Sequence, residues 1–419
     1  MNDIVYLLQC PPHWVKTPPL GLEFIRKYCS LKGIDVKVID LNAIIYRILK
    51  MPLKEWLSLN KYFEQSLYDT VKEKYPHIIK NTLEKLKNAD CVGFYLSSRN
   101  EHFTYKLIEE LKDAYPSKKI ALGGPQVLFK KLRGEPFDKR FSWVVGEGEK
   151  ASTAILNSKD NVVIDHNEIA NLDEIPFIDF SGININMYSK VFPLYSSRGC
   201  IRKCSFCTEK LISSKFRQHS PHYIVEQIKI ILNKYKINYF TFQDSIFDAN
   251  LAWLDKFLTL VLKEGLDIHW EAQIAVRGDF PLVLARLLRK SGCFNLFVGL
   301  ESASNKVLSA MNKGFTKETA FNFFKILKEA GLQYEISIIA GYPDEENKDF
   351  KETIEFITRN KAIIPKIAQI NPYIDYFSSS YIPSKQAIER VNRLIAVLKK
   401  ENIPYTKSFI NNLIYKNGN

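Results

Sequence analysis

Short apolar runs alternate with amphipathic segments along the first 150 residues. Ile4–Leu8 and Asp35–Asp40 are typical of strands, and the helical periodicity of residues 21–31 lies between them. Further apolar runs follow at 91–96, 119–122 and 143–145, each closed by a turn or a glycine pair. Strands separated by helices predict a parallel sheet, so we expect a Rossmann-like α/β domain here.

Six more strand–helix repeats follow the first domain. We expect strands at 194–196, 239–242, 269–272, 296–299, 334–339 and 366–370, with helices at 220–236, 251–264, 280–291, 304–310, 317–330 and 347–359. Six repeats predict a partial (β/α)6 barrel, although a full TIM-type barrel stays open. The predicted boundaries are 1–156 for the Rossmann-like domain, 157–190 for a linker, 191–370 for the barrel and 371–419 for a small α/β extension.

Composition and charge indicate an ordinary globular protein. The chain has 419 residues, 46% of them hydrophobic and 25% charged, which is ordinary for globular domains. Its net charge of +13 is spread over amphipathic helices without a long basic block, so nucleic acid is the less favoured partner. Because the start lacks a basic secretory leader and no uncharged run reaches membrane-spanning length, we expect a cytoplasmic protein.

The strongest chemical signal is a set of three cysteines. Cys200, Cys204 and Cys207 are spaced C-x3-C-x2-C, and the other four cysteines are scattered. Three thiolates on one loop can hold three corners of a cubane iron–sulfur cluster and leave the fourth iron open. A zinc site would need four ligands, usually two separated pairs, and no second pair is near. A disulfide with a spare thiol is the remaining alternative, and it suits a cytosolic chain poorly.

The cysteine motif and its preceding Arg198-Gly199 resemble the signature of the radical S-adenosylmethionine (SAM) enzymes. That resemblance implies a [4Fe-4S] cluster whose open iron binds SAM and cleaves it reductively to a 5′-deoxyadenosyl radical. It also implies an external one-electron donor such as flavodoxin or ferredoxin. Nothing in the sequence identifies the substrate, and we expect a small molecule or a peptide.

The same resemblance assigns residues after the barrel strands to SAM. Asp244 or Ser245 would accept a hydrogen bond from the methionine amino group of SAM. Arg277 would donate two hydrogen bonds to the SAM carboxylate, and Glu301 would accept one from a ribose hydroxyl. Simpler roles stay open: Asp244 as a helix cap, and Arg277–Glu301 as an ion pair. The implied SAM contacts are Phe206, Asp244, Ser245, Gln273, Arg277, Glu301, Gly341 and Tyr342. For Phe206 and Gly341, the alternatives are loop packing and a plain turn.

Motifs ahead of the cysteines resemble the cobalamin-binding branch of the same family. They include Pro18-Pro19-Leu20-Gly21-Leu22 and Leu122-Gly123-Gly124-Pro125. The Asp-x-His-x-x-Gly motif of classical cobalamin domains is absent, and Gln126 stands where other members often place histidine. A Rossmann-like domain kept for packing or substrate capture is the alternative. The implied cobalamin contacts are Leu20, Gly21, Ser97, Gly123, Gly124, Pro125, Gln126, Gly146, Glu147 and Gly148.

Together these features predict a radical SAM enzyme, and we expect it to transfer a methyl group to an unactivated carbon with cobalamin. A cyclase, epimerase or rearrangement enzyme of the same family is the first alternative, and an iron–sulfur redox or sensing protein is the second. The mechanism of the radical SAM rRNA methyltransferases is disfavoured, because it needs a cysteine near the carboxyl terminus and none follows Cys293.

Overall fold

The chain folds into two compact units, Met1–Phe192 and Pro193–Asn419. The computed structural model describes residues 4–58, 61–165, 168–213, 215–375 and 382–406. Parts of the expected C-terminal extension, at 376–381 and 407–419, lie outside this description. No helix within the described ranges combines the length and the apolar content that crossing a bilayer requires.

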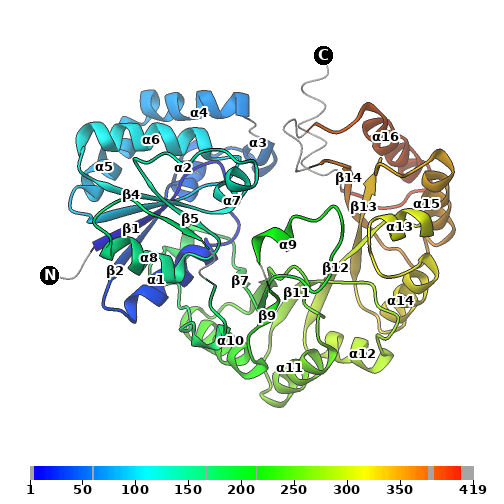
Figure 1. Cartoon of the computed structure of the whole chain (residues 1–419). Helices are drawn as coiled ribbons and strands as arrows, with labels where there is room; N and C mark the ends of the chain where they lie inside the picture. Colours follow the sequence, from blue (N-terminus) through cyan, green and yellow to red (C-terminus); the bar gives the residue numbers. More distant parts are fainter. Residues whose placement is uncertain (1–3, 59–60, 166–167, 214, 376–381, 407–419) are drawn as a thin grey trace. The chain divides into compact units, whose positions relative to one another are not determined.

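The first unit is built on a six-stranded parallel sheet (Figure 1), as the alternating pattern predicts. The strand order is β2-β1-β3-β4-β5-β6, so the chain extends the sheet to one side after β1 and to the other side from β3 onward. The gap between β1 and β3 is therefore the topological switch point. The strands are β1 (Ile4–Gln9), β2 (Asp35–Asp40), β3 (Cys91–Tyr95), β4 (Lys119–Gly123), β5 (Ser142–Val145) and β6 (Val163–Asp165).

Helices cover both faces of this sheet. On one face α1 packs with α8, and on the other α4, α5 and α6 pack together (Figure 1). Each face has its own apolar core, one around Trp56, Phe103 and Trp143 and the other around Leu7 and Val36. The helices are α1 (Leu20–Ser30), α2 (Leu41–Leu49), α3 (Leu53–Ser58), α4 (Lys61–Lys74), α5 (Pro76–Leu86), α6 (Glu101–Ala114), α7 (Pro125–Leu132) and α8 (Glu149–Asn157).

The segment expected to be a linker belongs to the first unit and is more ordered than its composition indicates. It contributes the edge strand β6 and two 3₁₀ turns, η1 (Leu172–Glu174) and η2 (Ile185–Met187). The Tyr188 hydroxyl donates to Asp40 at 2.6 Å, and Arg26 bonds Asp179 at 3.0 Å. These partners are about 150 residues apart in sequence, which is why a local pattern does not reveal them.

The second unit contains the predicted partial barrel. Its sheet has the linear order β14-β13-β12-β11-β10-β7, six strands without a seventh or eighth in the described part of the chain, so a full TIM-type barrel is wrong. The first strand lies earlier than expected, at β7, where Pro193 is tolerated because β7 is an edge strand. The strands are β7 (Phe192–Leu194), β10 (Tyr239–Phe242), β11 (His269–Ile274), β12 (Cys293–Glu301), β13 (Tyr334–Ala340) and β14 (Ile367–Pro372).

Local signals fix the helices of this unit. Asn250 caps α11 by accepting from the amides of Ala252 and Trp253, and Ser384 caps α16 by accepting from the amide of Ala387. The helices are α9 (Glu209–Ile212), α10 (Pro221–Tyr235), α11 (Leu251–Lys263), α12 (Leu282–Lys290), α13 (Asn305–Ala310), α14 (Lys317–Glu329), α15 (Asn347–Arg359) and α16 (Lys385–Lys400). The fold class is thus confirmed.

Candidate iron–sulfur and cofactor site

The three cysteines lie on a loop held between two short antiparallel strands, β8 (Ser197–Arg198) and β9 (Arg217–Gln218). Gly199 opens the loop with a φ of +84°, and a Cβ there would lie 2.8 Å from the carbonyl oxygen of Lys215. Both the positive φ and the close approach of the Lys215 carbonyl oxygen therefore require glycine at this position. The loop follows the first barrel strand, at the edge where parallel α/β folds collect their active sites.

A buried carboxylate anchors the start of this loop. Asp244 accepts hydrogen bonds from the Ser196 amide at 3.0 Å, from the Ser196 hydroxyl at 2.7 Å and from the Ser197 hydroxyl. Burial raises the pKa of Asp244 to about 6, and these hydrogen bonds oppose the rise. Both oxygens of Asp244 thus serve the loop, and the cap alternative is wrong because Asn250 caps α11.

The thiols have the hydrogen bonds that iron–sulfur ligands need. The Arg202 amide donates to Cys200 Sγ at 3.4 Å, and the Glu209 amide donates to Cys207 Sγ at 3.5 Å. Cys204 is buried. Burial raises the pKa of Cys200 and Cys207, and the neighbouring thiols raise it further, so the three sulfurs lie within electrostatic reach.

This donor set fits a cubane better than a single ion. Among the described residues, no three Cys, His, Asp or Glu side chains form a ready-made site for one metal ion. Three thiolates of a cubane bind three different irons, so they stand farther apart than ligands that share one ion. The donors are all sulfur, and amide groups already point at two of them, as expected for a cluster loop.

The segment after β12 supports the middle of the loop. The Ser205 amide donates to the Met311 carbonyl at 3.0 Å, and Asn312 Nδ2 donates to the Lys203 carbonyl at 2.9 Å. The Ser205 hydroxyl lies 2.8 Å from the Tyr342 hydroxyl. The sequence pattern assigned no role to Met311 or Asn312.

Phe206 packs on an apolar cluster of Val307, Met311 and Tyr342. Lys313 Nζ lies 5.7 Å from the centre of the Phe206 ring. This is the packing role that the sequence left open. It places an apolar layer directly beside two of the cysteines.

Glu301 has a backbone conformation that is rare outside glycine. Its φ is +67°, and the register between β12 and β13 shifts at this point. The Ser337 hydroxyl donates to Oε2 at 2.9 Å, and Lys313 Nζ lies 3.5 Å from Oε1. Backbone strain of this kind clusters at functional sites.

Arg277 pairs with Asp279 and not with Glu301, so the ion-pair alternative is wrong. Its Nε and Nη2 donate to the two Asp279 oxygens at 2.8 and 2.9 Å, and its Nη1 donates to the Asp248 carbonyl at 2.8 Å. The guanidinium donors of Arg277 are therefore already hydrogen-bonded within the protein. The nearby Gln273 Nε2 donates to the Ser245 carbonyl at 3.1 Å and joins the ends of β10 and β11.

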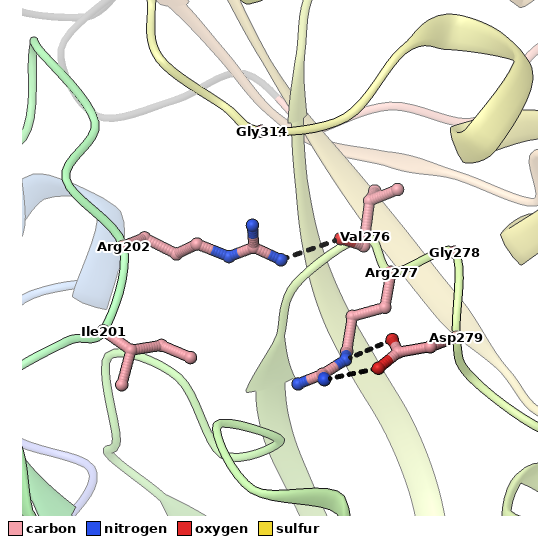
Figure 2. A pocket seen from close by; sticks show the side chains of 7 residues that line it. All are labelled: Ile201, Arg202, Val276, Arg277, Gly278, Asp279 and Gly314. Atoms are coloured by element: carbon pink, nitrogen blue, oxygen red, sulfur yellow. Dashed lines mark hydrogen bonds and ion pairs between the residues drawn. The ribbon is translucent and has the colours of Figure 1, made fainter.

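A pocket of about 390 Å³ lies beside the cysteine loop (Figure 2). Arg202 extends across it and donates to the Val276 carbonyl at 3.2 Å. The pocket combines two guanidinium groups with small residues. It is lined by Ile201, Arg202, Val276, Arg277, Gly278, Asp279 and Gly314.

Gly341 is required both by the backbone angle of the turn after β13 and by packing. Its φ is +80°, and a Cβ would lie 2.4 Å from Ala387 Cβ of α16. Its amide donates to Glu345 Oε2 at 2.7 Å. The turn after β13 is thus closed by α16.

The first unit brings the other predicted residues to the carboxyl edge of its sheet. Leu20 and Gly21 begin α1, and the expected residues at 123–126 and 146–148 follow β4 and β5. A Cβ at Gly124 would lie 2.6 Å from the Leu96 carbonyl oxygen, so glycine is needed for close packing there. At Gly21 and Gly146 a Cβ would meet nothing within 4 Å, which leaves open backbone at this edge.

Three polar residues of this set bond within the protein. Gln126 Nε2 donates to Glu101 at 3.0 Å, and Glu147 accepts from the Ile169 amide at 2.9 Å. The Ser97 amide donates to Asn100 at 2.8 Å. The side chains of Gln126 and Glu147 are thus engaged within the protein.

Comparison with known proteins finds a family profile that matches part of the chain, and relatives that match most of it. The sequence profile of the Radical SAM superfamily matches residues 194–357. The chain is 26% identical over 382 residues to an uncharacterized methyltransferase of Pyrococcus horikoshii. The match covers 85% of this chain and 76% of the relative. The chain is also 25% identical over 338 residues to the bacteriochlorophyllide d C-8(2)-methyltransferase of Chlorobaculum tepidum, covering 74% and 73%.

Solved structures share the two-unit fold. The cobalamin-dependent SAM radical enzyme OxsB, with aqua-cobalamin and SAM bound, matches with a TM-score of 0.70 and 16% identity. The match covers 95% of this chain and 56% of OxsB, so this chain spans little more than half of that protein. The methyltransferase TsrM from Kitasatospora setae matches with a TM-score of 0.64 and 16% identity, covering 89% and 73%. Residues 194–357 thus form a radical SAM domain.

Proposed function

We propose that this chain is a cobalamin-dependent radical SAM enzyme that transfers a methyl group to an unactivated carbon. The observation that carries the proposal is the joint occurrence of the cysteine loop and a Rossmann-like unit with an open glycine edge in one chain. Solved proteins with this two-unit fold are cobalamin-dependent, and the curated relatives reported above are named methyltransferases.

Cys200, Cys204 and Cys207 would hold the cluster. When bound, the cluster and SAM supply a 5′-deoxyadenosyl radical, and cobalamin supplies the methyl group. The amides of Arg202 and Glu209 would stabilise negative charge on the sulfurs, since they already donate to Cys200 and Cys207. The apolar layer around Phe206 would keep water from reactive species.

SAM would bind across the carboxyl ends of the barrel strands. Glu301 would accept a ribose hydroxyl, because Ser337 and Lys313 hold its carboxylate in one orientation. Ser245 would accept a hydrogen bond from the methionine amino group of SAM. Asp244 would not, because its oxygens already accept hydrogen bonds from the start of the cysteine loop. Arg277 would reach the carboxylate only by exchanging one of its bonds to Asp279.

Cobalamin would lie at the carboxyl edge of the first sheet. Gly21 and Gly146 would let the corrinoid tail approach the backbone closely. The substrate would be a small molecule or a peptide, and an external protein would donate each electron. We expect the enzyme to work in the cytoplasm, where such donors are found.

Product analysis tests this function. The protein is purified without oxygen, reconstituted with iron, sulfide and hydroxocobalamin, and incubated with SAM and a strong reductant. We expect 5′-deoxyadenosine from the reductive cleavage of SAM, and S-adenosylhomocysteine from transfer of the methyl group of a second SAM to the reduced cobalamin. 5′-Deoxyadenosine without S-adenosylhomocysteine would favour the cyclase, epimerase or rearrangement class. An intact cluster without SAM cleavage would favour a redox or sensing protein.

A matched pair of variants links the products to the cysteine loop. Cys204→Ser should lose cluster iron and SAM cleavage together. Cys293→Ser should keep both, because Cys293 is buried in β12 with its Sγ donating to the Asn295 carbonyl at 3.7 Å. Zinc in place of iron in the wild-type protein, or full turnover by Cys204→Ser, would contradict the proposal.

A further inference from the structure

The outer side of the cysteine loop lies at the protein surface. Ile201, between the first two cysteines, is 45% exposed. Lys203 and Ser205 are exposed as well, whereas Cys204 between them is buried. The chain thus passes from the exterior to the interior and back within three residues. A cluster held by Cys204 would therefore lie directly beneath this surface.

The segment after α13 extends the same surface. Asn312 and Gly314 are exposed, and Asn312 Nδ2 donates to the Lys203 carbonyl at 2.9 Å. A Cβ at Gly314 would lie 3.0 Å from Arg202 Nη1, so the two segments also lie close together there. A partner would therefore meet a surface that is already formed. This cysteine-loop surface comprises residues 201–205 and 312–314.

The cysteine-loop surface carries positive charge that the protein does not compensate. Its charged residues are Arg202, Lys203 and Lys313, and it contains no Asp or Glu. Lys313 pairs with Glu301, but neither Arg202 nor Lys203 forms an ion pair with any described residue. The Arg202 guanidinium donates instead to the carbonyls of Val276 at 3.2 Å and Lys313 at 3.5 Å. Two cations are thus available to the carboxylates of a partner.

A recess lies beside this surface. Ile201 and Arg202 line the pocket of about 390 Å³ together with Gly278 and Asp279 (Figure 2). Asp279 is paired with Arg277, so its negative charge is balanced within the protein. Complexes between electron carriers and their partners bury little area, typically less than about 1,200 Å² in total. Two short segments and one recess suit a contact of that small size.

We propose that an acidic one-electron carrier protein docks on the cysteine-loop surface. Carboxylates of the carrier would pair with Arg202 and Lys203, and apolar side chains around its redox centre would contact Ile201. The inference rests on the proposed function, because it requires a cluster that accepts electrons. Docking here brings the carrier directly over Cys204, where the path to the cluster is short.

The charge of the whole chain acts in the same direction. Its net charge of +13 attracts an acidic protein at long range, and the two unpaired cations orient it at close range. Each encounter moves one electron from the carrier to the cluster, so the carrier is oxidised, the cluster is reduced, and no bond or proton is exchanged. The reductase of the carrier, with NADPH, supplies the next electron.

Binding of oxidised flavodoxin to the reconstituted full-length protein tests the surface without turnover. Flavodoxin is the probe because it is a small acidic one-electron carrier. We expect Lys203→Glu and Ile201→Ser each to raise the dissociation constant, measured by titration calorimetry, roughly fivefold to tenfold. Lys256→Glu is the matched control, since Lys256 is exposed on α11, and its dissociation constant should equal that of the wild type. An unchanged constant in Lys203→Glu, or an equal rise in Lys256→Glu, would overturn the proposal.

SAM cleavage with two reductants separates docking from damage to the cluster site. With dithionite, Lys203→Glu and Ile201→Ser should form 5′-deoxyadenosine at the wild-type rate. With flavodoxin, its reductase and NADPH, each variant should need roughly fivefold to tenfold more flavodoxin for the half-maximal rate. Raising the salt from about 0.02 M to about 0.3 M should weaken the wild type more than Lys203→Glu. An equal loss of rate with both reductants would overturn the assignment.

The dithionite reaction also distinguishes the two levels of failure. If wild-type protein does not cleave SAM with dithionite, the proposed function is wrong and the docking surface is wrong with it. If dithionite supports cleavage but neither flavodoxin nor ferredoxin does, the function stands and only the docking surface is wrong. Loss of RNA binding in Lys203→Glu, with flavodoxin binding unchanged, would assign the surface to nucleic acid instead.

Discussion

Asp248 is a fully buried carboxyl group with one oxygen unsatisfied. Its Oδ1 accepts from the Ala275 amide at 3.0 Å, whereas Oδ2 has no hydrogen-bond partner among the described residues. Burial raises its pKa from 3.8 to about 6, although Arg277 and Arg202 oppose the rise. The substitution Asp248→Asn keeps the shape of the side chain and the oxygen that accepts from Ala275, and it removes the group that ionises.

The sign of the effect follows from proton linkage. Because the folded state has the higher pKa, it favours the protonated carboxyl, so this contribution to stability is complete below pH 3.8 and is lost as pH rises through about 6. Each pKa unit corresponds to about 1.4 kcal/mol, which gives about 3 kcal/mol in total. Asp248→Asn should therefore be more stable than wild type by up to about 3 kcal/mol at pH 8, and equal to it near pH 4.

Urea unfolding of both proteins between pH 4 and pH 8 measures this difference. A gain of this size raises the melting temperature of a unit this large by about 6–12 °C. Asp279→Asn is the matched control, because its carboxyl is 64% exposed and pairs with Arg277, so its effect should stay below about 1 kcal/mol. A destabilised Asp248→Asn, or a gain that does not vary with pH, would refute the reasoning and show that Oδ2 is bonded in solution.

Three further changes test other contacts. Arg390→Ala should cost about 3–5 kcal/mol in urea unfolding, since it strands the buried Glu345 carboxylate 2.8 Å away, and a loss under 1 kcal/mol would contradict this. Gly124→Ala should lower the melting temperature more than Gly134→Ala does. Gly134 also has a positive φ, but a Cβ there meets no atom within 4 Å, so its substitution should cost only roughly 1–2 kcal/mol of stability. Equal losses of stability in the two variants would contradict a steric clash at Gly124. Tyr342→Phe should cost about 0.5–1.5 kcal/mol and release cluster iron to a chelator faster, and an unchanged release rate would argue against a supporting role.

Local patterns predicted the elements well, because strands, glycine turns and caps leave signals within a few residues. The bounds of α16 follow from Ser384 and the helical periodicity behind it. The strand β7 was misplaced because a proline normally argues against a strand, and only its position at the sheet edge permits Pro193.

The roles of polar side chains were less predictable. Asp244 was expected to face SAM, but its partners Ser196 and Ser197 lie 48 and 47 residues away in sequence. Arg277 was expected to bind the SAM carboxylate or to pair with Glu301. Its guanidinium instead bonds Asp279, only two residues ahead, in a turn that periodicity does not define.

The bonds between the stretch after α8 and the first sheet bear on how this protein can be divided. A fragment that stops at residue 156 would remove Tyr188 from the fully buried Asp40, and Asp179 from Arg26. Asp40 would then be a buried carboxyl without its hydroxyl donor, and Arg26 would keep only its bonds to Glu23. Anyone who wishes to produce the amino-terminal half by itself should therefore retain the chain through Phe192.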